Sequence, residues 1–385
     1  MTALAARTRE TVTFHAVELM KQAYELQRAG VDIISLGVGE PDFTAVPQVI
    51  DAMESAARAG NSGYSSPAGI PQLREAISQY YATQLNTNVD PDRIIVTTGA
   101  SGALMLAAMA LVNPGDEILM PDPCYPPNRN FIGAAGGVTK LIPTTATNRF
   151  QLSSSDIEQN WGPRTKGVLI ASPSNPTGTS LTRSELDKVF KTVKSKGGFV
   201  IMDEIYLGLS YDGERKSALT LDDDAIIINS FSKYFNMTGW RLGWMVVPKH
   251  MVAPIEKMVA SLAICAPTLA QYGAVACFEP TSIAIYEQRR EAFRQRRDFL
   301  VPALESMNIK VPVIPDGAFY VYADVSAHAS DSNVLSTSLL QGARVVAVPG
   351  IDFGPAHASH MMRFAYTTSL DRLKEAMSRI KKYLG

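Results

Sequence analysis

Residues 229–244 read Asn229-Ser230-Phe231-Ser232-Lys233-Tyr234-Phe235-Asn236-Met237-Thr238-Gly239-Trp240-Arg241-Leu242-Gly243-Trp244. The apolar run 225–228 before them is typical of a buried strand, so Lys233 is expected where a sheet passes the chain to a loop. Ligands of open α/β sheets bind at such places. Lys233 offers an amine to a carbonyl, and Arg241 with the nearby hydroxyls offers partners to a phosphate. A solvated loop lysine and a surface arginine would show the same spacing, so this stretch alone leaves both interpretations open.

The bulk properties exclude several classes of protein. A chain of 385 residues favours one large domain plus a smaller one. A formal net charge of -1 gives no electrostatic footprint for nucleic acid or an anionic membrane. Cys124, Cys265 and Cys277 form no CxxC pair, which argues against a disulfide framework or a zinc site and favours a reducing cytoplasm. No apolar run is long enough to cross a bilayer, and the N-terminus lacks a secretory pattern.

Apolar, β-branched runs alternate with helical patterns through the first two thirds of the chain. Because such alternation is typical of βαβ units, it predicts a mainly parallel sheet of seven strands covered by helices on both faces, an α/β fold. The predicted strands are 94–98, 117–120, 137–142, 167–171, 199–202, 225–229 and 244–247. The clearest helix is 183–196, which Thr182 and Glu185 open in capping-box spacing.

The C-terminal part predicts a smaller α+β domain, with strands 319–323, 345–348 and 362–365 and helices 332–341 and 370–383. We expect an N-terminal arm over 1–14, a first part of the small domain over 15–45, the large domain over 46–282, and the second part of the small domain over 283–385. Prolines predict breaks at Pro254 and Pro267 in the helical segment 248–278. The helix 283–306 carries an arginine run that predicts a solvated face: Arg289, Arg290, Arg294, Arg296 and Arg297.

Two breaks after predicted strands carry groups that suit a phosphorylated pyridine aldehyde. Gly99-Ala100-Ser101 opens a helix, where unpaired N–H groups and the positive dipole end favour a phosphate. A plain structural turn is the usual meaning of such residues. Asp203 closes a strand, where its carboxylate can hold a pyridinium N–H and keep the ring protonated as an electron sink. A helix cap at Asp203 or Glu204 is the simpler alternative.

Three further side chains fit the same ligand, pyridoxal phosphate. Tyr206 and Asn175 are suited to donate to its 3-oxygen, and Tyr125 to stack on its ring. Each has an ordinary explanation as well: core aromatics for the tyrosines, and a turn initiator for Asn175 before Pro176. The individual residues therefore indicate the ligand only weakly.

Taken in order, four motifs resemble the class I/II (fold-type I) aminotransferases, in particular the aspartate aminotransferase-like subgroup. They are Asn175-Pro176-Thr177-Gly178, Asp203-Glu204-Ile205-Tyr206, Ser230-Phe231-Ser232-Lys233 and Thr238-Gly239-Trp240-Arg241-Leu242-Gly243. Pro349-Gly350-Ile351-Asp352-Phe353-Gly354 is also similar to a loop of this family. The resemblance covers essentially the whole chain and implies the fold of a fold-type I pyridoxal-phosphate enzyme with a transaminase activity of EC 2.6.1 type.

The resemblance assigns cofactor-binding roles by position. Lys233 corresponds to the Schiff-base lysine and Asp203 to the partner of the ring nitrogen, while Tyr206 and Asn175 correspond to the ligands of the 3-oxygen and Tyr125 to the stacking aromatic. Tyr64 corresponds to a tyrosine that reaches the phosphate of a partner subunit, which implies a homodimer with composite sites. The phosphate cup corresponds to Gly99, Ala100, Ser101, Ser230, Ser232 and Arg241.

The same resemblance implies which residues bind the substrate. Arg363 corresponds to the arginine that grips the substrate α-carboxylate, and Gly37 lines the same pocket. A dicarboxylic substrate needs a second cation, for which Arg129 is the nearby candidate, with a helix-surface arginine as the alternative. The histidines match no catalytic position of the family, and the chemistry requires no metal.

The expected reaction is ping-pong transamination through an aldimine on Lys233, which then serves as general base and acid. The predicted amino donor is aspartate or another small L-amino acid, with a 2-oxo acid such as 2-oxoglutarate as the acceptor. A C–S β-lyase or synthase of the same fold would share every cofactor contact and differ only in its product. A ligand-sensing domain without catalysis is the third alternative, disfavoured because no basic helix-turn-helix segment precedes residue 15.

Overall fold

The protein was analysed as a computed structural model, which describes residues 2–5, 8, 14–212 and 215–385. The arm predicted over residues 1–14 lies largely outside the described residues. Within those residues, no helix combines the length and the apolar character that a membrane crossing requires.

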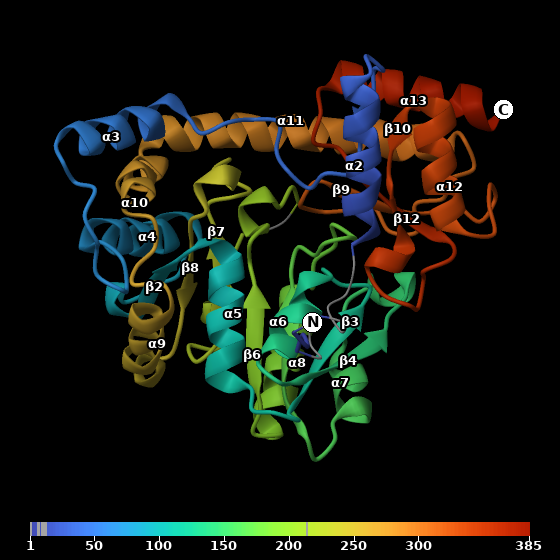
Figure 1. The fold of residues 1–385 in the computed structure, drawn as a ribbon. Helices are drawn as coiled ribbons and strands as arrows, with labels where there is room; N and C mark the ends of the chain where they lie inside the picture. The colour runs from blue at the N-terminus through green and yellow to red at the C-terminus, as the bar shows by residue number, and fades with distance from the viewer. Residues whose placement is uncertain (1, 6–7, 9–13, 213–214) are drawn as a thin grey trace.

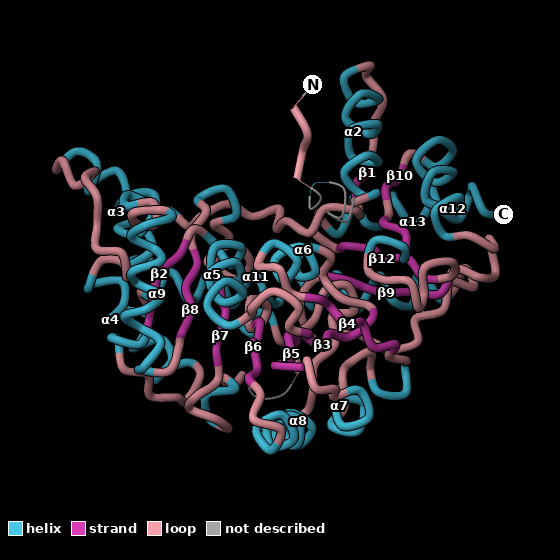
Figure 2. The backbone as a smooth tube through the Cα atoms, turned by 60° about the horizontal axis from the view of Figure 1, so that its bottom comes forward, coloured by secondary structure: helices cyan, strands magenta, loops and turns pink. Residues whose placement is uncertain are grey.

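A seven-stranded sheet forms the centre of the molecule, with strand order β2-β8-β7-β6-β5-β3-β4. The strands follow one another in this order across the view of Figure 2. Strand β8 runs antiparallel to both neighbours, and the other pairs are parallel, which confirms the predicted fold class. The strands are β2 (Ile94–Thr97), β3 (Glu117–Asp122), β4 (Val138–Pro143), β5 (Thr165–Ala171), β6 (Phe199–Asp203), β7 (Ile226–Ser230) and β8 (Gly243–Val246).

Helices bury both faces of this sheet, which is why its central strands carry runs of consecutive apolar residues rather than apolar residues at alternate positions. On one face, Ile201 and Ile228 pack with Leu104 and Ala107 of α5. On the other face, Met202 belongs to the same buried cluster as the apolar side of α8. The helices of this part are α3 (Pro47–Arg58), α4 (Pro71–Gln84), α5 (Gly99–Leu111), α6 (Pro127–Ala134), α7 (Ser154–Asn160), α8 (Arg183–Ser195), α9 (Lys249–Leu262) and α10 (Thr268–Val275).

Two smaller sheets lie beside the large one and join distant parts of the chain. Strand β1 (Ile34–Ser35) pairs in parallel with β10 (Val345–Val346), and β12 (Met361–Ala365) pairs antiparallel with both β11 (Val348–Pro349) and β9 (Tyr320–Asp324). The long helix α11 runs above the sheet toward α13 (Figure 1). The helices here are α2 (His15–Arg28), α11 (Pro280–Glu305), α12 (Ser332–Ser338) and α13 (Leu370–Leu384).

Three predictions of local structure were wrong at least in part. Helix α9 continues through Pro254, because the missing N–H would bond only the carbonyl of His250, an exposed residue near the start of the helix. The predicted helix 332–341 is α12 followed by a π-helical turn, Leu339–Ala343. The predicted strand 345–348 is divided between β10 and β11, which pair with different partners.

The arginine run of α11 is not simply a solvated face. Arg296 is 6% exposed, forms two hydrogen bonds of 2.7 and 2.9 Å with Asp42, and lies against the ring of Phe43. Arg297 is 7% exposed and donates to the carbonyl of Pro315 and the carboxylate of Asp212. Because partners from distant segments cover these two cations, a charge pattern along one helix could not reveal their burial.

Candidate active site

A cavity of about 710 Å³ opens at the carboxyl ends of the central parallel strands, where Ala171, Asp203 and Ser230 end β5, β6 and β7. It collects most of the residues that the sequence singled out from distant positions. The predicted residues that line it are Gly37, Ala100, Ser101, Tyr125, Asn175, Asp203, Tyr206, Ser230, Ser232, Lys233, Arg241 and Arg363.

The Lys233 amine reaches across the cavity toward the loop after β1. Its Nζ donates a hydrogen bond of 2.7 Å to the carbonyl oxygen of Gly39 and lies 5.9 Å from the ring centre of Phe319. Burial lowers the pKa of this amine to about 8, and the positive charges of Arg363 and Arg241 act in the same direction. A substantial fraction of Lys233 is therefore neutral, and so nucleophilic, near neutral pH.

Asp203 ends strand β6 as a carboxylate that is 5% exposed. It accepts a hydrogen bond of 3.0 Å from the backbone N–H of Ile205, and burial raises its pKa to about 6. Removal from water makes this charge costly unless a cation or a protonated ring nitrogen faces it. Tyr206 lies one turn further on, 4% exposed, with its hydroxyl 2.9 Å from the hydroxyl of Tyr320.

The predicted phosphate cup lies where α5 begins. Thr98 provides no side-chain cap for this helix, so the first N–H groups, with the positive end of the helix dipole, are free for an anion. Arg241 stands beside them in a left-handed conformation with φ of 52°. Gly99 does not line the cavity but stands directly behind it, because an added Cβ would lie 2.7 Å from Nη2 of Arg241. Any larger residue at position 99 would displace the guanidinium.

Arg363 projects from β12 into the cavity and is 3% exposed. Its Nη1 donates to Oδ1 of Asn175 at 2.8 Å and its Nη2 donates to the carbonyl of Gly37 at 2.6 Å. The guanidinium lies between the rings of Tyr320 and Phe353, 4.5 and 4.9 Å from their centres. Its orientation is thus fixed before any ligand binds, while the cation has no carboxylate among the partners named here.

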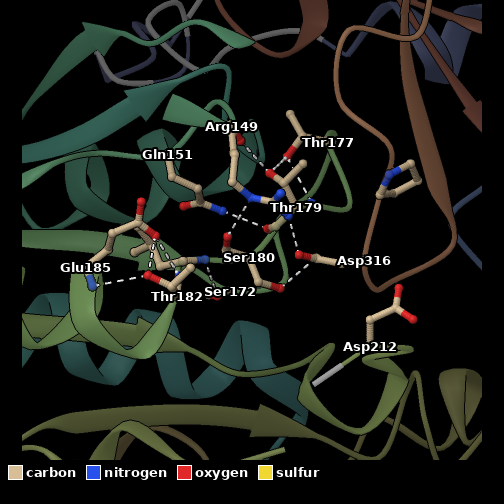
Figure 3. A network of polar contacts seen from close by, with 12 residues as sticks. Arg149, Gln151, Ser172, Thr177, Thr179, Ser180, Thr182, Glu185, Asp212 and Asp316 are labelled. Atoms are coloured by element: carbon tan, nitrogen blue, oxygen red, sulfur yellow. Dashed lines mark hydrogen bonds and ion pairs between the residues drawn. The ribbon is translucent and has the colours of Figure 1, made fainter. Parts of the chain in front are cut away.

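A polar network fixes the loop that carries Asn175 (Figure 3). Gln151 donates to the carbonyl of Thr179 at 2.7 Å, and Ser180 donates to Asp316 at 2.8 Å. Arg149 also pairs with Asp316. These contacts tie the loop to the segment just before β9, so the position of Asn175 depends on chain that is far away in sequence.

Two predicted site residues lie elsewhere. The side chain of Tyr64 is 81% exposed and does not line the cavity. Arg129, in α6, is also absent from the lining and donates from Nη2 to the backbone carbonyl of Asp352 at 2.9 Å. This single chain therefore brings neither side chain to the cofactor or the substrate.

Several lining residues carried no motif and were missed. Tyr320 touches both Tyr206 and Arg363, and its position in a predicted strand gave no sign of this role. Helix α2 also lines the cavity, although its sequence shows only an ordinary amphipathic pattern. The residues added by the structure are Phe14, Ala16, Val17, Met20, Lys21, Tyr24, Val38, Gly39, Leu104, Ala171, Ile205, Thr238 and Tyr320.

The donor set fits pyridoxal phosphate. Lys233 would hold its carbonyl carbon, and Asp203 its ring nitrogen, which a buried carboxylate with few partners suits well. The free N–H groups of α5 with Arg241 would hold the phosphate. The same cavity thus offers a cofactor site at these residues and a carboxylate site at Arg363.

Comparison with known proteins agrees with this geometry. The sequence model described as aminotransferase class I and II matches residues 31–380. The valine–pyruvate aminotransferase of Mycobacterium tuberculosis is 35% identical over 373 residues, which cover 96% of each chain. The aspartate/prephenate aminotransferase of Thermus thermophilus is 33% identical over 388 residues, with 100% of each chain covered.

Solved structures of aminotransferases also resemble this chain. A crystal structure of an aminotransferase from Mycobacterium tuberculosis superposes with a TM-score of 0.96 at 35% identity, covering 100% of this chain and 99% of that one. The aspartate aminotransferase of Thermus thermophilus, solved with maleate, superposes with a TM-score of 0.94 at 32% identity, with 100% of both chains covered. The resemblance predicted from the motifs is confirmed, and this chain belongs to the class I and II aminotransferases, enzymes that use pyridoxal phosphate.

Proposed function

We propose that this enzyme moves the amino group of a small L-amino acid to a 2-oxo acid such as pyruvate or 2-oxoglutarate, in two half-reactions at one site. The observation that carries this proposal is Arg363, a buried guanidinium that lines the cavity and is held by Asn175 and Gly37. A planar cation in this position suits the α-carboxylate that both amino acids and 2-oxo acids contain. One carboxylate site can therefore serve both half-reactions.

The proposed chemistry needs one mobile proton and one electron sink. Bound pyridoxal phosphate supplies the sink when its ring nitrogen is protonated. Lys233 would take the proton from Cα and deliver it to the carbon that bore the cofactor's carbonyl oxygen, because a pKa of about 8 lets the amine exist in both forms near neutral pH. Arg363 fixes the carboxylate and so orients the Cα–H bond. Asp203 holds the counter-charge that keeps the ring nitrogen protonated.

The cavity favours a donor with a small, neutral side chain. Most of the lining surface of the cavity is apolar and includes Val17, Met20 and Val38. Arg129, the cation that a dicarboxylic donor was expected to use, is turned to the carbonyl of Asp352 instead. A donor with a neutral side chain would bring no unpaired charge into this apolar cavity.

Aspartate is the second candidate donor, which the sequence also favoured. Lys21 lines the cavity from α2, and among the described residues its ion pair is the surface contact with Glu18, at 3.4 Å. It is a cation that a second carboxylate could use. The relatives named for aspartate and for valine with pyruvate leave both donor classes open.

A panel of amino donors with pyruvate and with 2-oxoglutarate tests the proposal. We expect new amino acid and new 2-oxo acid in equal amounts, with alanine-sized and branched apolar donors turned over faster than aspartate. Product analysis also tests the rival β-lyase: release of ammonia and pyruvate from a cysteine conjugate, without a new amino acid, would refute transamination.

We further propose a homodimer whose sites are shared. Tyr64 is expected to contact a phosphate, yet its side chain is 81% exposed here, so the ligand it would touch belongs to a second copy of the chain. Sedimentation should therefore detect a dimer, and a fully active monomer would contradict the proposal.

The parallel pairing of β1 with β10 supports the expected small domain of residues 15–45 and 283–385. The three cysteines are free, in keeping with the predicted cytoplasmic location.

A further inference from the structure

Helix α2 forms one wall of the active-site cavity. Val17, Met20, Lys21 and Tyr24, which we call the α2 wall, line the cavity from this helix. Their spacing of three and four residues places them on one side of the helix. Val17 and Tyr24 are 53% and 61% exposed, so the α2 wall presents open apolar surface to whatever enters the cavity.

The other side of α2 fixes the helix to the small sheets. Leu19 and Ala23 are buried in a cluster with Ile33, Leu340 and Val346. These contacts hold the middle of the helix by apolar packing, which sets its distance from the sheets. A directional contact at the helix end adds a second restraint on its register.

Asp352 supplies that contact. The residue before α2, Phe14, provides no side-chain cap. Oδ1 of Asp352 accepts hydrogen bonds from the backbone N–H of His15 at 2.7 Å and from Nδ1 of His15 at 2.8 Å, and Oδ2 accepts from the N–H of Ala16 at 2.8 Å. The carboxylate is fully buried and lies 337 residues from His15 in sequence. A charged cap at a helix N-terminus is favoured by both the free N–H groups and the helix dipole.

The turn that carries Asp352 also touches Arg363. Asp352 ends the short helical turn Gly350–Asp352, and Nη2 of Arg129 donates to its backbone carbonyl at 2.9 Å. The next residue, Phe353, packs its ring 4.9 Å from the Arg363 guanidinium. One rigid turn therefore fixes the start of α2 on one side and the proposed carboxylate site on the other.

We propose that Asp352, held in place by Arg129, is a positioning residue that sets the α2 wall at its distance from Arg363, and so determines how tightly the substrate side chain is bound. This inference rests on the proposed function, since it takes Arg363 as the carboxylate site. In this inference Arg129 holds Asp352 in place and does not contact a dicarboxylic substrate directly. The position of the wall then limits which amino donors fit.

The test compares Asp352→Ala and Asp352→Asn with the unchanged enzyme, all loaded with pyridoxal phosphate. We expect Asp352→Ala to raise KM for apolar donors about tenfold or more, because hydrogen bonds to a buried charge are each worth about that factor. The kcat should change less than about threefold, since the wall binds the side chain without taking part in chemistry. Asp352→Asn keeps one acceptor oxygen, so its KM should lie between the KM of Asp352→Ala and that of the unchanged enzyme.

Hydrogen exchange gives a readout independent of turnover. The amides of residues 15–28 should exchange faster in Asp352→Ala, whereas the visible absorbance of the bound cofactor should stay unchanged. Asp90→Ala is the matched control, because Asp90 caps the short helical turn Pro91–Arg93 through the N–H of Asp92 at 2.9 Å and does not line the cavity. That variant should loosen its own helical turn and leave every KM unaltered.

Two more variants make the inference easy to overturn. Arg129→Met should raise KM for apolar donors, as Asp352→Ala does; loss confined to aspartate would instead show direct substrate contact and overturn the positioning role. Tyr24→Ala changes an exposed side chain, so it should fold normally and still alter KM for the larger donors. Unchanged KM values in Asp352→Ala and Tyr24→Ala together would refute the α2 wall as a substrate contact.

The proposed function and this inference can fail separately. If the unchanged enzyme transfers no amino group from any donor, the proposed function is wrong. The wall can still be tested by calorimetric binding of α-methylleucine, which has a carboxylate and an apolar side chain but no Cα hydrogen. Weaker binding of this probe to Asp352→Ala would support the inference, and equal binding to both proteins would overturn it.

Discussion

The strand-end floor of the cavity, formed by Asp203, Ser230 and Lys233, and the α2 wall are built in different ways. Each floor residue sits at or just after a strand of one sheet and belongs to a recognisable motif. The wall consists of ordinary helix residues whose place in the cavity depends on a carboxylate from residue 352. The comparison teaches that cofactor chemistry is encoded locally, whereas the surface that selects a substrate arises from contacts between distant segments.

The largest effect is expected on the floor. Lys233→Ala removes both the covalent anchor and the proton carrier, so turnover should fall by at least about a thousandfold. The visible absorbance of the bound cofactor should disappear with it. Lys21 belongs to the α2 wall, and Lys21→Ala should keep that absorbance. Equal loss of absorbance in both variants would show that the wall, like the floor, is needed to hold the cofactor.

A strong effect is also expected at Arg363, which lies between floor and wall. Arg363→Met should raise KM for every amino donor and 2-oxo acid by about a hundredfold, because it removes a bidentate partner of the carboxylate and leaves Asn175 without its donor. Steady-state kinetics with one apolar and one acidic donor measure this. An effect on the acidic donor alone would place the α-carboxylate elsewhere.

The pH dependence of cofactor capture examines Lys233 itself. Its pKa is lowered from 10.5 to about 8, mainly by burial, so the neutral amine is the minor form below that pH. Capture of pyridoxal phosphate by the cofactor-free protein should speed up about tenfold per pH unit below pH 8 and level off above it. The Lys233 amine binds its proton more tightly in the unfolded chain than in the folded protein. The free energy of unfolding of the cofactor-free protein should therefore increase as pH rises from 8 to 10.5. A capture rate that still climbs near pH 10 would contradict the lowered pKa.

The smallest effect is expected at Tyr320. Tyr320→Phe removes the hydroxyl that lies 2.9 Å from the Tyr206 hydroxyl but keeps the ring against Arg363. We expect kcat to fall by about tenfold or less, with KM nearly unchanged, since one neutral hydrogen bond is worth about 1 kcal/mol. Tyr320→Ala, which also removes the ring, should raise KM as well; identical kinetics in the two variants would show that the ring does not support Arg363.

Much of the fold and of the cofactor site could be predicted from the sequence, because both depend on local patterns. The seven strands follow from apolar runs, and Asp203, Lys233 and Arg363 follow from motifs at strand ends or within a strand. Burial of Arg296 could not be predicted, since its partners Asp42 and Phe43 lie about 250 residues away in a separate segment. Tyr320 was missed for the same reason: its neighbours in the cavity are not its neighbours in the chain.

Arg129 separates the two kinds of information most clearly. The sequence by itself determined the family, the cofactor and the groups proposed to hold it, because a pyridoxal phosphate site needs particular side chains at strand ends and these are visible in a linear pattern. Only the tertiary structure decided that Arg129 turns to Asp352, that Asp352 caps α2, and that α2 closes one side of the cavity. Hydrogen-bond direction and packing between remote segments decide such contacts, and neither leaves a periodic trace in the chain.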